Sequence, residues 1–428
     1  MKKICLLLII CFGAIFTPVT AFVSADDVYE TPAKAAIAID SDSGKILYAQ
    51  NADKAMGIAS ITKIITAYLT LDAIKKGTLH WDDKVKMSDY AYELTQNPEA
   101  SNIAVNDKDE SFSIRDLFNA TMIQSANSAA ITLAEKVGGT EPKFVDMMKS
   151  QLAYWGITDA KLVNASGLNN SVLGKNIYPG SSETAENELS AKDVAIVAQH
   201  LIRDFPDTLA TTKKATETFD KGGASEQTLA TYNYMLPGLP AARAGVDGLK
   251  TGTTEFAGAC FVATTMQNNF RIITVVLNAD GADTDDYARF TATGGLMNYV
   301  YGTWTARIIA NKDVKMSVPE APTKLTVLDG QKTSVNVLPS DNFSTVVPMA
   351  SDSKTSLSFS KKQGADVTAA ITKHQKLVKV TFNIKDKLGY LPGSDGEKFY
   401  LTATSAVPRS NSVKVMWNHF VRFVNEKL

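Results

Sequence analysis

Three short groups of polar residues could perform chemistry in this sequence. They occupy residues 60–63 (Ser-Ile-Thr-Lys), 125–127 (Ser-Ala-Asn) and 250–252 (Lys-Thr-Gly), in that order. A serine hydroxyl becomes a good nucleophile only when a base removes its proton. Residues i and i+3 share a face of a helix, so Lys63 can reach back to Ser60. The spacing therefore predicts a serine nucleophile that is activated by a lysine.

The first lysine can act as a base only if its pKa falls. Burial and a second nearby cation both lower a lysine pKa, and Lys250 is the natural second cation. Ser60 at a helix start also gains backbone N–H groups and the positive end of the helix dipole, where an oxyanion could develop. Taken singly, Ser60 could be an N-cap and Lys63 a solvated helix lysine. The ordered set favours catalysis.

Similar short patterns recur later in the chain. Ser-x-x-Lys occurs at 351–354 and 358–361, Ser-x-Asn at 334–336, and Ser-Asp-Asn at 340–342. They follow the only Lys-Thr-Gly, so their order is wrong, and no helical pattern follows their serines. We interpret them as chance polar loops.

Other functional classes lack support. The chain has four histidines, none in a zinc motif, and no Cys-x-x-Cys pair, so we expect no metal and no cofactor. No phosphate-binding loop or Gly-x-Ser-x-Gly elbow occurs, and nothing positive supports a Ser-His-Asp triad. A formal net charge of -1 argues against nucleic acid as a partner.

The N-terminus predicts export. Lys2 and Lys3 precede an apolar run at 4–16, and small residues follow at 23–25. This pattern is typical of a secretory signal peptide over residues 1–25. The remaining chain has one cysteine, Cys260, within an apolar run at 257–263. We expect a core residue there and no internal disulfide.

The periodicities outline an architecture. Residues 35–49 predict a β-hairpin, and 257–278 predict another. Between them lie helical patterns: an amphipathic helix from Ser60, then helices that begin at Ser113 and Asn127, and one over 141–155. Strands from both ends suggest an α/β domain over residues 30–310. We expect an antiparallel sheet flanked by helices, with an inserted helical subdomain.

The rest of the chain has a different character. Residues 313–406 contain short β-rich runs at 324–328, 334–338 and 377–384, which predict a small all-β domain. Residues 412–428 predict an amphipathic helix, with Trp417 and Phe420 on its apolar face. The helix is too short to span a bilayer. It could lie in a membrane interface or pack on its own domain.

On these motifs the chain resembles the low-molecular-mass penicillin-binding proteins, the serine D-Ala-D-Ala carboxypeptidases. The likeness covers about residues 35–301 and includes 164–168 (Asn-Ala-Ser-Gly-Leu), 189–195 and 245–252. It implies the β-lactamase/transpeptidase-like fold, a peptidoglycan stem peptide ending in D-Ala-D-Ala as substrate, and β-lactams as inhibitors. A β-rich domain and a C-terminal anchor also fit that family, so we expect a peripheral protein on the extracytoplasmic face of the cell membrane.

The resemblance assigns catalytic roles residue by residue. Ser60 is acylated, and Lys63 is the base. Ser125 relays a proton to the leaving amine, and Asn127 binds the substrate amide.

The resemblance also assigns a binding set. Lys250 supplies positive charge to the site, and Thr251, beside Gly252, contacts a carboxylate. The N–H groups of Ser60 and Thr253 form the oxyanion hole, although some relatives carry His at the latter position. Arg289 matches, by a spacing count, an arginine that attracts the terminal carboxylate of the substrate.

Two other functions compete with this one. A β-lactamase of the same fold would need an efficient deacylating base, and residues 186–188 (Glu-Asn-Glu) faintly resemble such a loop. The structural alternative is that these residues merely precede a helix, which Ser190 and Asp193 begin as a capping box. A non-catalytic wall-binding protein is the third possibility, but all three motifs are intact.

Overall fold

The computed structural model describes residues 29–98, 100–350, 355–394 and 397–427. The predicted signal peptide, residues 1–25, lies outside the described residues, as does the second Ser-x-x-Lys pattern at 351–354.

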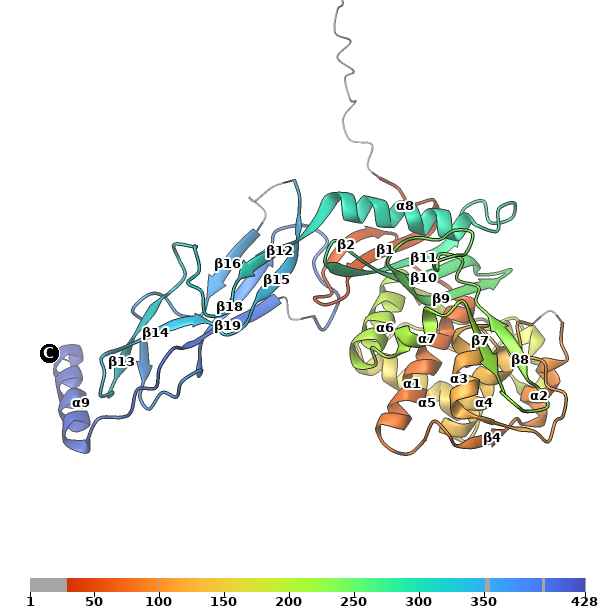
Figure 1. The fold of residues 1–428 in the computed structure, drawn as a ribbon, viewed down its shortest axis with the longest axis horizontal. Helices are drawn as coiled ribbons and strands as arrows, with labels where there is room; N and C mark the ends of the chain where they lie inside the picture. Colours follow the sequence, from red (N-terminus) through yellow and green to blue (C-terminus); the bar gives the residue numbers. More distant parts are fainter. Residues whose placement is uncertain (1–28, 99, 351–354, 395–396, 428) are drawn as a thin grey trace, which may run out of the picture. The chain divides into compact units, whose positions relative to one another are not determined.

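A five-stranded antiparallel sheet, ordered β2-β1-β11-β10-β9, forms the central layer of the first region of the chain, residues 33–303 (Figure 1). Both predicted hairpins are confirmed, and they pair directly with each other, with Ile37 opposite Val275. The ends of the region therefore build one sheet, as predicted. The strands are β1 (Ala33–Asp40), β2 (Ile46–Gln50), β9 (Val246–Thr254), β10 (Gly258–Gln267) and β11 (Phe270–Ala279).

Helices cover both faces of this sheet, with α8 on one face and α6 and α1 on the other (Figure 1). The helices of this region are α1 (Lys63–Lys75), α2 (Asp89–Thr95), α3 (Ile114–Met122), α4 (Asn127–Gly138), α5 (Glu141–Tyr154), α6 (Ala191–Asp204), α7 (Thr208–Thr212) and α8 (Ala288–Thr303). The predicted capping box is present: the Ser190 side chain accepts from the Asp193 N–H, and the Asp193 side chain accepts from the Ser190 N–H.

Short elements connect the helices. Paired strands are β3 (Ala55–Gly57) with β6 (Glu188–Ser190), β4 (Lys84–Lys86) with β5 (Ser111–Ser113), and β7 (Thr216–Phe219) with β8 (Gln227–Ala230). Among the described residues, 3-10 turns occur at η1 (Ala59–Thr62), η2 (Asn170–Val172) and η3 (Gly174–Asn176).

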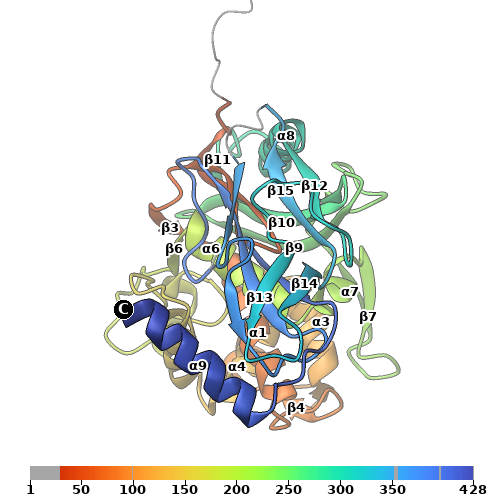
Figure 2. The same cartoon turned by 90° about the vertical axis from the view of Figure 1, so that its left-hand side faces the viewer.

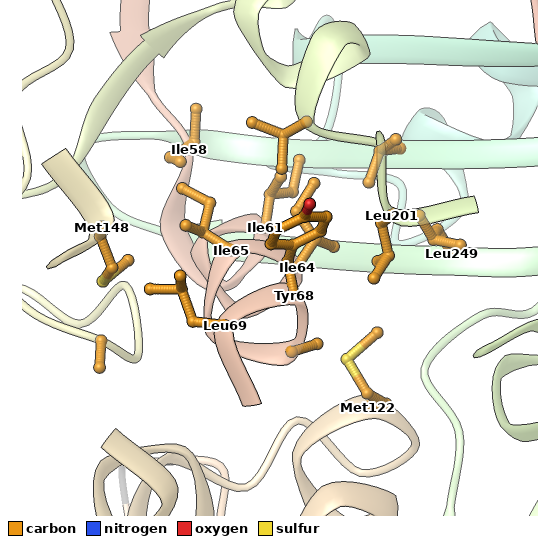
Figure 3. Close-up of a cluster of buried hydrophobic side chains, with 14 of the residues drawn as sticks. Ile58, Ile61, Ile64, Ile65, Tyr68, Leu69, Met122, Met148, Leu201 and Leu249 are labelled. Atoms are coloured by element: carbon orange, nitrogen blue, oxygen red, sulfur yellow. The ribbon is translucent and has the colours of Figure 1, made fainter. Parts of the chain in front are cut away.

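The helix behind the first motif differs from the prediction. Its existence is confirmed, but it is not amphipathic, because every residue from Lys63 to Leu71 is buried. Ser60 also precedes the helix, in η1. Figure 3 shows α1 surrounded by side chains of other elements, including Met122 of α3 and Leu249 of β9. A helix that is buried on all sides needs no polar face, so the helix can hold the nucleophile in a rigid setting.

The region after α8 is β-rich, as predicted. Its strands form the pair β12-β15 and a six-stranded sheet ordered β16-β18-β19-β14-β13-β17. The bounds are β12 (Trp304–Ala310), β13 (Lys324–Leu328), β14 (Ser334–Pro339), β15 (Phe343–Pro348), β16 (Thr355–Phe359), β17 (Asp366–Thr368), β18 (Lys376–Ile384) and β19 (Glu397–Ala403). Residues 304–310 were predicted to lie in the first domain, but in the structure these residues form β12, which pairs with β15 of the β-rich region.

The predicted C-terminal helix is present as α9 (Ser412–Lys427). Figure 2 shows it lying beside the β-rich region, and Arg422 contacts Asp329, which follows β13. Over the described parts of the chain, no helix is both long and apolar enough to cross a membrane.

Candidate active site

The structure brings the first two motifs together around Lys63. Its Nζ donates to Ser60 Oγ at 2.9 Å, to Asn127 Oδ1 at 2.7 Å and to the backbone oxygen of Ser166 at 2.7 Å. The lysine is fully buried, and Ser60 is half-buried. All three of these acceptors are uncharged, which is unusual for a buried ammonium group.

These contacts set the direction of the lysine lone pair. A neutral amine has two N–H donors, and two of its neighbours here are carbonyl oxygens. The Asn127 amide is held in this orientation because its Nδ2 donates to Ser101 O at 2.8 Å. When both N–H groups bind these carbonyls, the lone pair faces the Ser60 hydroxyl, so the geometry suits proton removal from Ser60.

Electrostatics favour the neutral form of this lysine. Burial lowers the pKa of Lys63 well below its ordinary value, and the charge of Lys250 lowers it further. The pKa of Lys250 falls to about 7, mainly through burial and also through Arg289. Both causes favour the neutral form of Lys63, which can accept a proton.

Backbone strain marks both serines of the site. Ser125 has φ 61° and Ala59, next to the nucleophile, has φ 45°, although neither is a glycine. Left-handed conformations of such residues cost about 1–3 kcal/mol and cluster at functional sites. Ser125 is buried between α3 and α4, beside Asn127, which opens α4.

Strand β9 brings the third motif against the nucleophile turn. A Cβ on Gly252 would lie 2.7 Å from Ile58 O and 3.1 Å from Ser60 N, so only glycine permits this approach. Lys250 and Thr251 are buried on the same strand, and Thr253 is exposed at its end.

Arg289 also reaches this strand, from α8. Its guanidinium donates to Gly252 O at 2.9 Å and to Thr253 Oγ1 at 2.7 Å. The residue selected by spacing thus lies beside the third motif, where a cation can attract a carboxylate. Its role in substrate binding stays a prediction.

The contacts of the Asn127 side chain differ from the predicted contact with the substrate amide. Both polar atoms of its side chain already bind protein groups, Lys63 and Ser101 O. The structure therefore supports a positioning role for Asn127, and its contact with the substrate amide stays a prediction.

Sequence reasoning missed the carbonyl of Ser166 as a partner of the lysine. Residues 164–168 entered the prediction only through their family likeness. The glycine of this segment was the available signal: Gly167 has φ +84° and packs on Ala59 O, so that loop must approach the nucleophile turn closely.

The loop at residues 186–188, considered above as a source of a deacylating base, is bonded to neighbouring parts of the protein. Glu186 is 5% exposed, and its carboxylate accepts from Thr254 Oγ1 at 2.6 Å and from Asn169 Nδ2 at 2.9 Å. Asn187 Nδ2 donates to Thr62 Oγ1 at 2.9 Å. These bonds favour the structural alternative for the loop.

Metal-ligand residues and the cysteine of the mature chain are the other side chains that could carry chemistry. Within the described ranges, no group of three or more His, Cys, Asp or Glu residues could hold a metal ion. Cys260 is fully buried on β10, and burial raises the pKa of its thiol to about 11, so it is the core residue that was predicted.

A buried lysine bonded to a serine on a tight turn, beside an edge strand with Lys-Thr-Gly, is the arrangement of a serine hydrolase of the penicillin-binding class. The family model described as D-alanyl-D-alanine carboxypeptidase matches residues 20–281, and that of the C-terminal domain of penicillin-binding protein 5 matches residues 305–409. The chain belongs to the D-alanyl-D-alanine carboxypeptidase family and is a serine D-Ala-D-Ala carboxypeptidase.

Individual relatives agree with this assignment. The chain is 31% identical over 383 residues to the D-alanyl-D-alanine carboxypeptidase DacC of Escherichia coli (strain K12), covering 88% of this chain and 86% of that protein. The crystal structure of a peptidoglycan synthesis regulatory factor (PBP3) from Streptococcus pneumoniae superposes with a TM-score of 0.80 at 42% identity, over 89% of this chain and 100% of that one. Penicillin-binding protein D2 from Listeria monocytogenes, solved with ampicillin bound, has a TM-score of 0.53 at 32% identity, over 64% and 98%.

Proposed function

We propose that Ser60 carries the acyl group when the enzyme removes the terminal D-alanine of a peptidoglycan stem peptide. Ser60 Oγ attacks the carbonyl between the two D-alanines while Lys63 takes its proton. Backbone N–H groups of Ser60 and Thr253 stabilise the oxyanion. Ser125 passes a proton to the leaving D-alanine, and water later hydrolyses the ester. The triple contact of Lys63 with Ser60, Asn127 and Ser166 is the observation that carries this proposal.

The substrate carboxylate has a matching site. Lys250 and Thr251 lie on β9, and Arg289 of α8 contacts the same strand at Gly252, which packs against the nucleophile turn. A terminal carboxylate bound there would be held by cations and a hydroxyl while the scissile carbonyl faces Ser60.

β-Lactams are expected to acylate the same serine, because ampicillin is bound in the related Listeria protein. The test is labelling with a fluorescent penicillin, followed by mass spectrometry of the adduct. Ser60→Ala should abolish labelling, whereas Ser358→Ala, in the other described Ser-x-x-Lys pattern, should leave it intact. Labelling that survives Ser60→Ala would refute the assignment of the nucleophile.

The tail supports a peripheral membrane location after export. On α9 the side chains of Met416, Trp417 and Phe420 are 69%, 63% and 57% exposed. The opposite side is held to the β-rich region, where His419 and Arg422 contact Asp329 at 2.9 and 3.1 Å. An exposed apolar face next to basic residues fits the headgroup layer of a bilayer.

Sedimentation with anionic liposomes tests this location. Apolar burial outweighs the attraction of a few cations, on the order of 1 kcal/mol each, so the full chain should stay bound at high salt. Trp417→Ala with Phe420→Ala should release it, and Lys414→Ala should have little effect. A chain ending before Ser412 should stay in solution and still bind penicillin. Failure of the full chain to sediment would refute the anchor.

A further inference from the structure

A buried carboxyl group outside the three motifs contacts the loop that holds the catalytic lysine. Glu141, the first residue of α5, is 4% exposed. Its Oε1 accepts from the backbone N–H of Ala165 at 2.9 Å, and its Oε2 accepts from Tyr90 Oη at 3.0 Å. Burying a carboxyl group is costly, so this contact points to a specific task for the residue.

The task follows from what lies on either side of Ala165. Its carbonyl accepts from Thr66 Oγ1 at 2.6 Å, on the α1 turn that follows Lys63. The next carbonyl along the chain, that of Ser166, accepts from Lys63 Nζ. Ala165 is therefore held by its N–H through Glu141 and by its oxygen through Thr66, and these two bonds anchor the backbone from which the Ser166 carbonyl extends. The peptide group of that carbonyl is held at its other end, because the Gly167 N–H donates to Asn164 Oδ1 at 2.6 Å.

We propose that Glu141 is a positioning residue for the base: by holding Ala165, it aims the Ser166 carbonyl at Lys63 and so directs the lysine lone pair toward Ser60. This inference rests on the proposed role of Lys63 as the base. Without that carbonyl, one N–H of the neutral lysine has no fixed acceptor, and the lone pair can turn away from the serine hydroxyl.

Both ionisation states of Glu141 can serve this role. Burial, with a smaller contribution from Glu135 of α4, raises its pKa to about 7, although the bonds from Ala165 and from Tyr90 of α2 oppose the rise. When Glu141 is protonated, the proton can lie on Oε2 and be donated to Tyr90 Oη, which leaves the Ala165 bond intact. Glutamine has the same acceptor and donor arrangement, so Glu141→Gln should preserve function.

The test compares acylation by a fluorescent penicillin in the full-length protein. Glu141→Ala should lower the second-order rate constant about tenfold or more, because a small misplacement of a catalytic group has effects of this size. Glu141→Gln should keep a rate constant close to that of wild type, because the amide oxygen can accept the same bond from Ala165. Tyr90→Phe is the matched control: it also removes a bond to Glu141 but leaves Ala165 held, so it should acylate normally.

The pH profile separates positioning from loss of folded protein. A carbonyl acceptor stabilises charged Lys63 more than neutral Lys63, so losing it lowers the lysine pKa. The acidic limb of the acylation profile should then shift to lower pH in Glu141→Ala, whereas partial unfolding would lower only the plateau. If the alanine variant does not fold, Glu141→Asp, whose shorter side chain falls short of Ala165, should show the same shift.

The possible results are distinct. A wild-type protein that is not labelled at Ser60 refutes the proposed function itself. A labelled wild type with an alanine or aspartate variant of unchanged rate and unchanged acidic limb refutes only the role of Glu141. A glutamine variant as slow as the alanine variant also refutes it, because the amide keeps the bond to Ala165.

Discussion

Replacing Gly167 with alanine should damage the nucleophile turn from a position outside all three motifs. Gly167 has φ +84°, and a Cβ there would lie 1.9 Å from Ala59 O and 2.9 Å from Ser60 N. Ser60 N belongs to the predicted oxyanion hole, and Ala59 is itself in the left-handed region. The new methyl group must therefore displace the backbone that presents the nucleophile, because no flexible side chain can yield.

The size of the effect can be separated into two parts. A left-handed backbone costs a non-glycine residue about 1–2 kcal/mol. Overpacking against rigid neighbours adds about 1–3 kcal/mol. Gly180 isolates the first part, since it has φ +81° and a Cβ added there would meet no atom within 4 Å. Gly180→Ala should therefore lose only the backbone contribution, and Gly167→Ala should lose both.

Acylation by fluorescent penicillin and thermal unfolding measure the two consequences. Gly167→Ala should unfold at a lower temperature than Gly180→Ala and acylate about a hundredfold more slowly, as expected for a shift of about 1 Å in a reacting group. Gly180→Ala should acylate at the wild-type rate. Equal acylation by both variants would refute the claim that this glycine positions Ser60.

Three further predictions concern charged groups. Lys63→Arg should lower acylation more than about a hundredfold, because a guanidinium cannot act as a base; near-normal rates would mean that another group is the base. Lys250→Met should abolish efficient acylation yet raise stability below pH 7, where folded wild type buries the cation. Between pH 7 and the ordinary lysine pKa of 10.5, the unfolded wild type binds one more proton at Lys250 than the folded protein does. The stability of wild type relative to this variant should therefore rise by about 1.4 kcal/mol per pH unit over that range; a pH-independent difference in denaturation would contradict the lowered pKa. Glu186→Gln should leave the lifetime of the penicillin adduct unchanged, and a tenfold longer lifetime would make Glu186 a deacylating base.

Patterns that depend on local chemistry predicted much of the fold. The capping residues Ser113 and Ser190 begin α3 and α6 as expected, since a cap is a contact between near neighbours in the chain. The two hairpins and the C-terminal helix were also predicted, because alternation and helical spacing repeat over several residues.

The error over α1 has a physical cause. An amphipathic helix was expected there, and such a helix has a solvent-exposed polar face. Thr66 and Thr70 are in fact buried, and their hydroxyls donate to Ala165 O and Thr66 O. Threonine can satisfy its hydroxyl within a helix or against a neighbouring loop, so its presence does not establish a solvent-exposed face.

The backbone part of the site, the Ser166 carbonyl that accepts from Lys63, could not be predicted from the sequence. The order of the motifs selected Ser60, Lys63 and Lys250, and the structure brings them together. The Ser166 carbonyl has no side-chain signature, and its approach to Lys63 depends on contacts across 103 positions of the chain. A loop carbonyl becomes a candidate only when the fold shows what it faces.

The arrangement of the two lysines explains why the surrounding framework is so heavily bonded. Lys63 and Lys250 are both buried, and each destabilises the folded state at any pH where it is charged. A carboxylate partner would relieve that cost, but it would also raise the pKa of Lys63 and so oppose the role as a base that we propose for it. Carbonyl acceptors orient the amine without a full opposing charge. Glu141 bonds to the backbone N–H of Ala165, the residue before Ser166. A buried acid can therefore position the Ser166 carbonyl without placing its own charge in contact with Lys63.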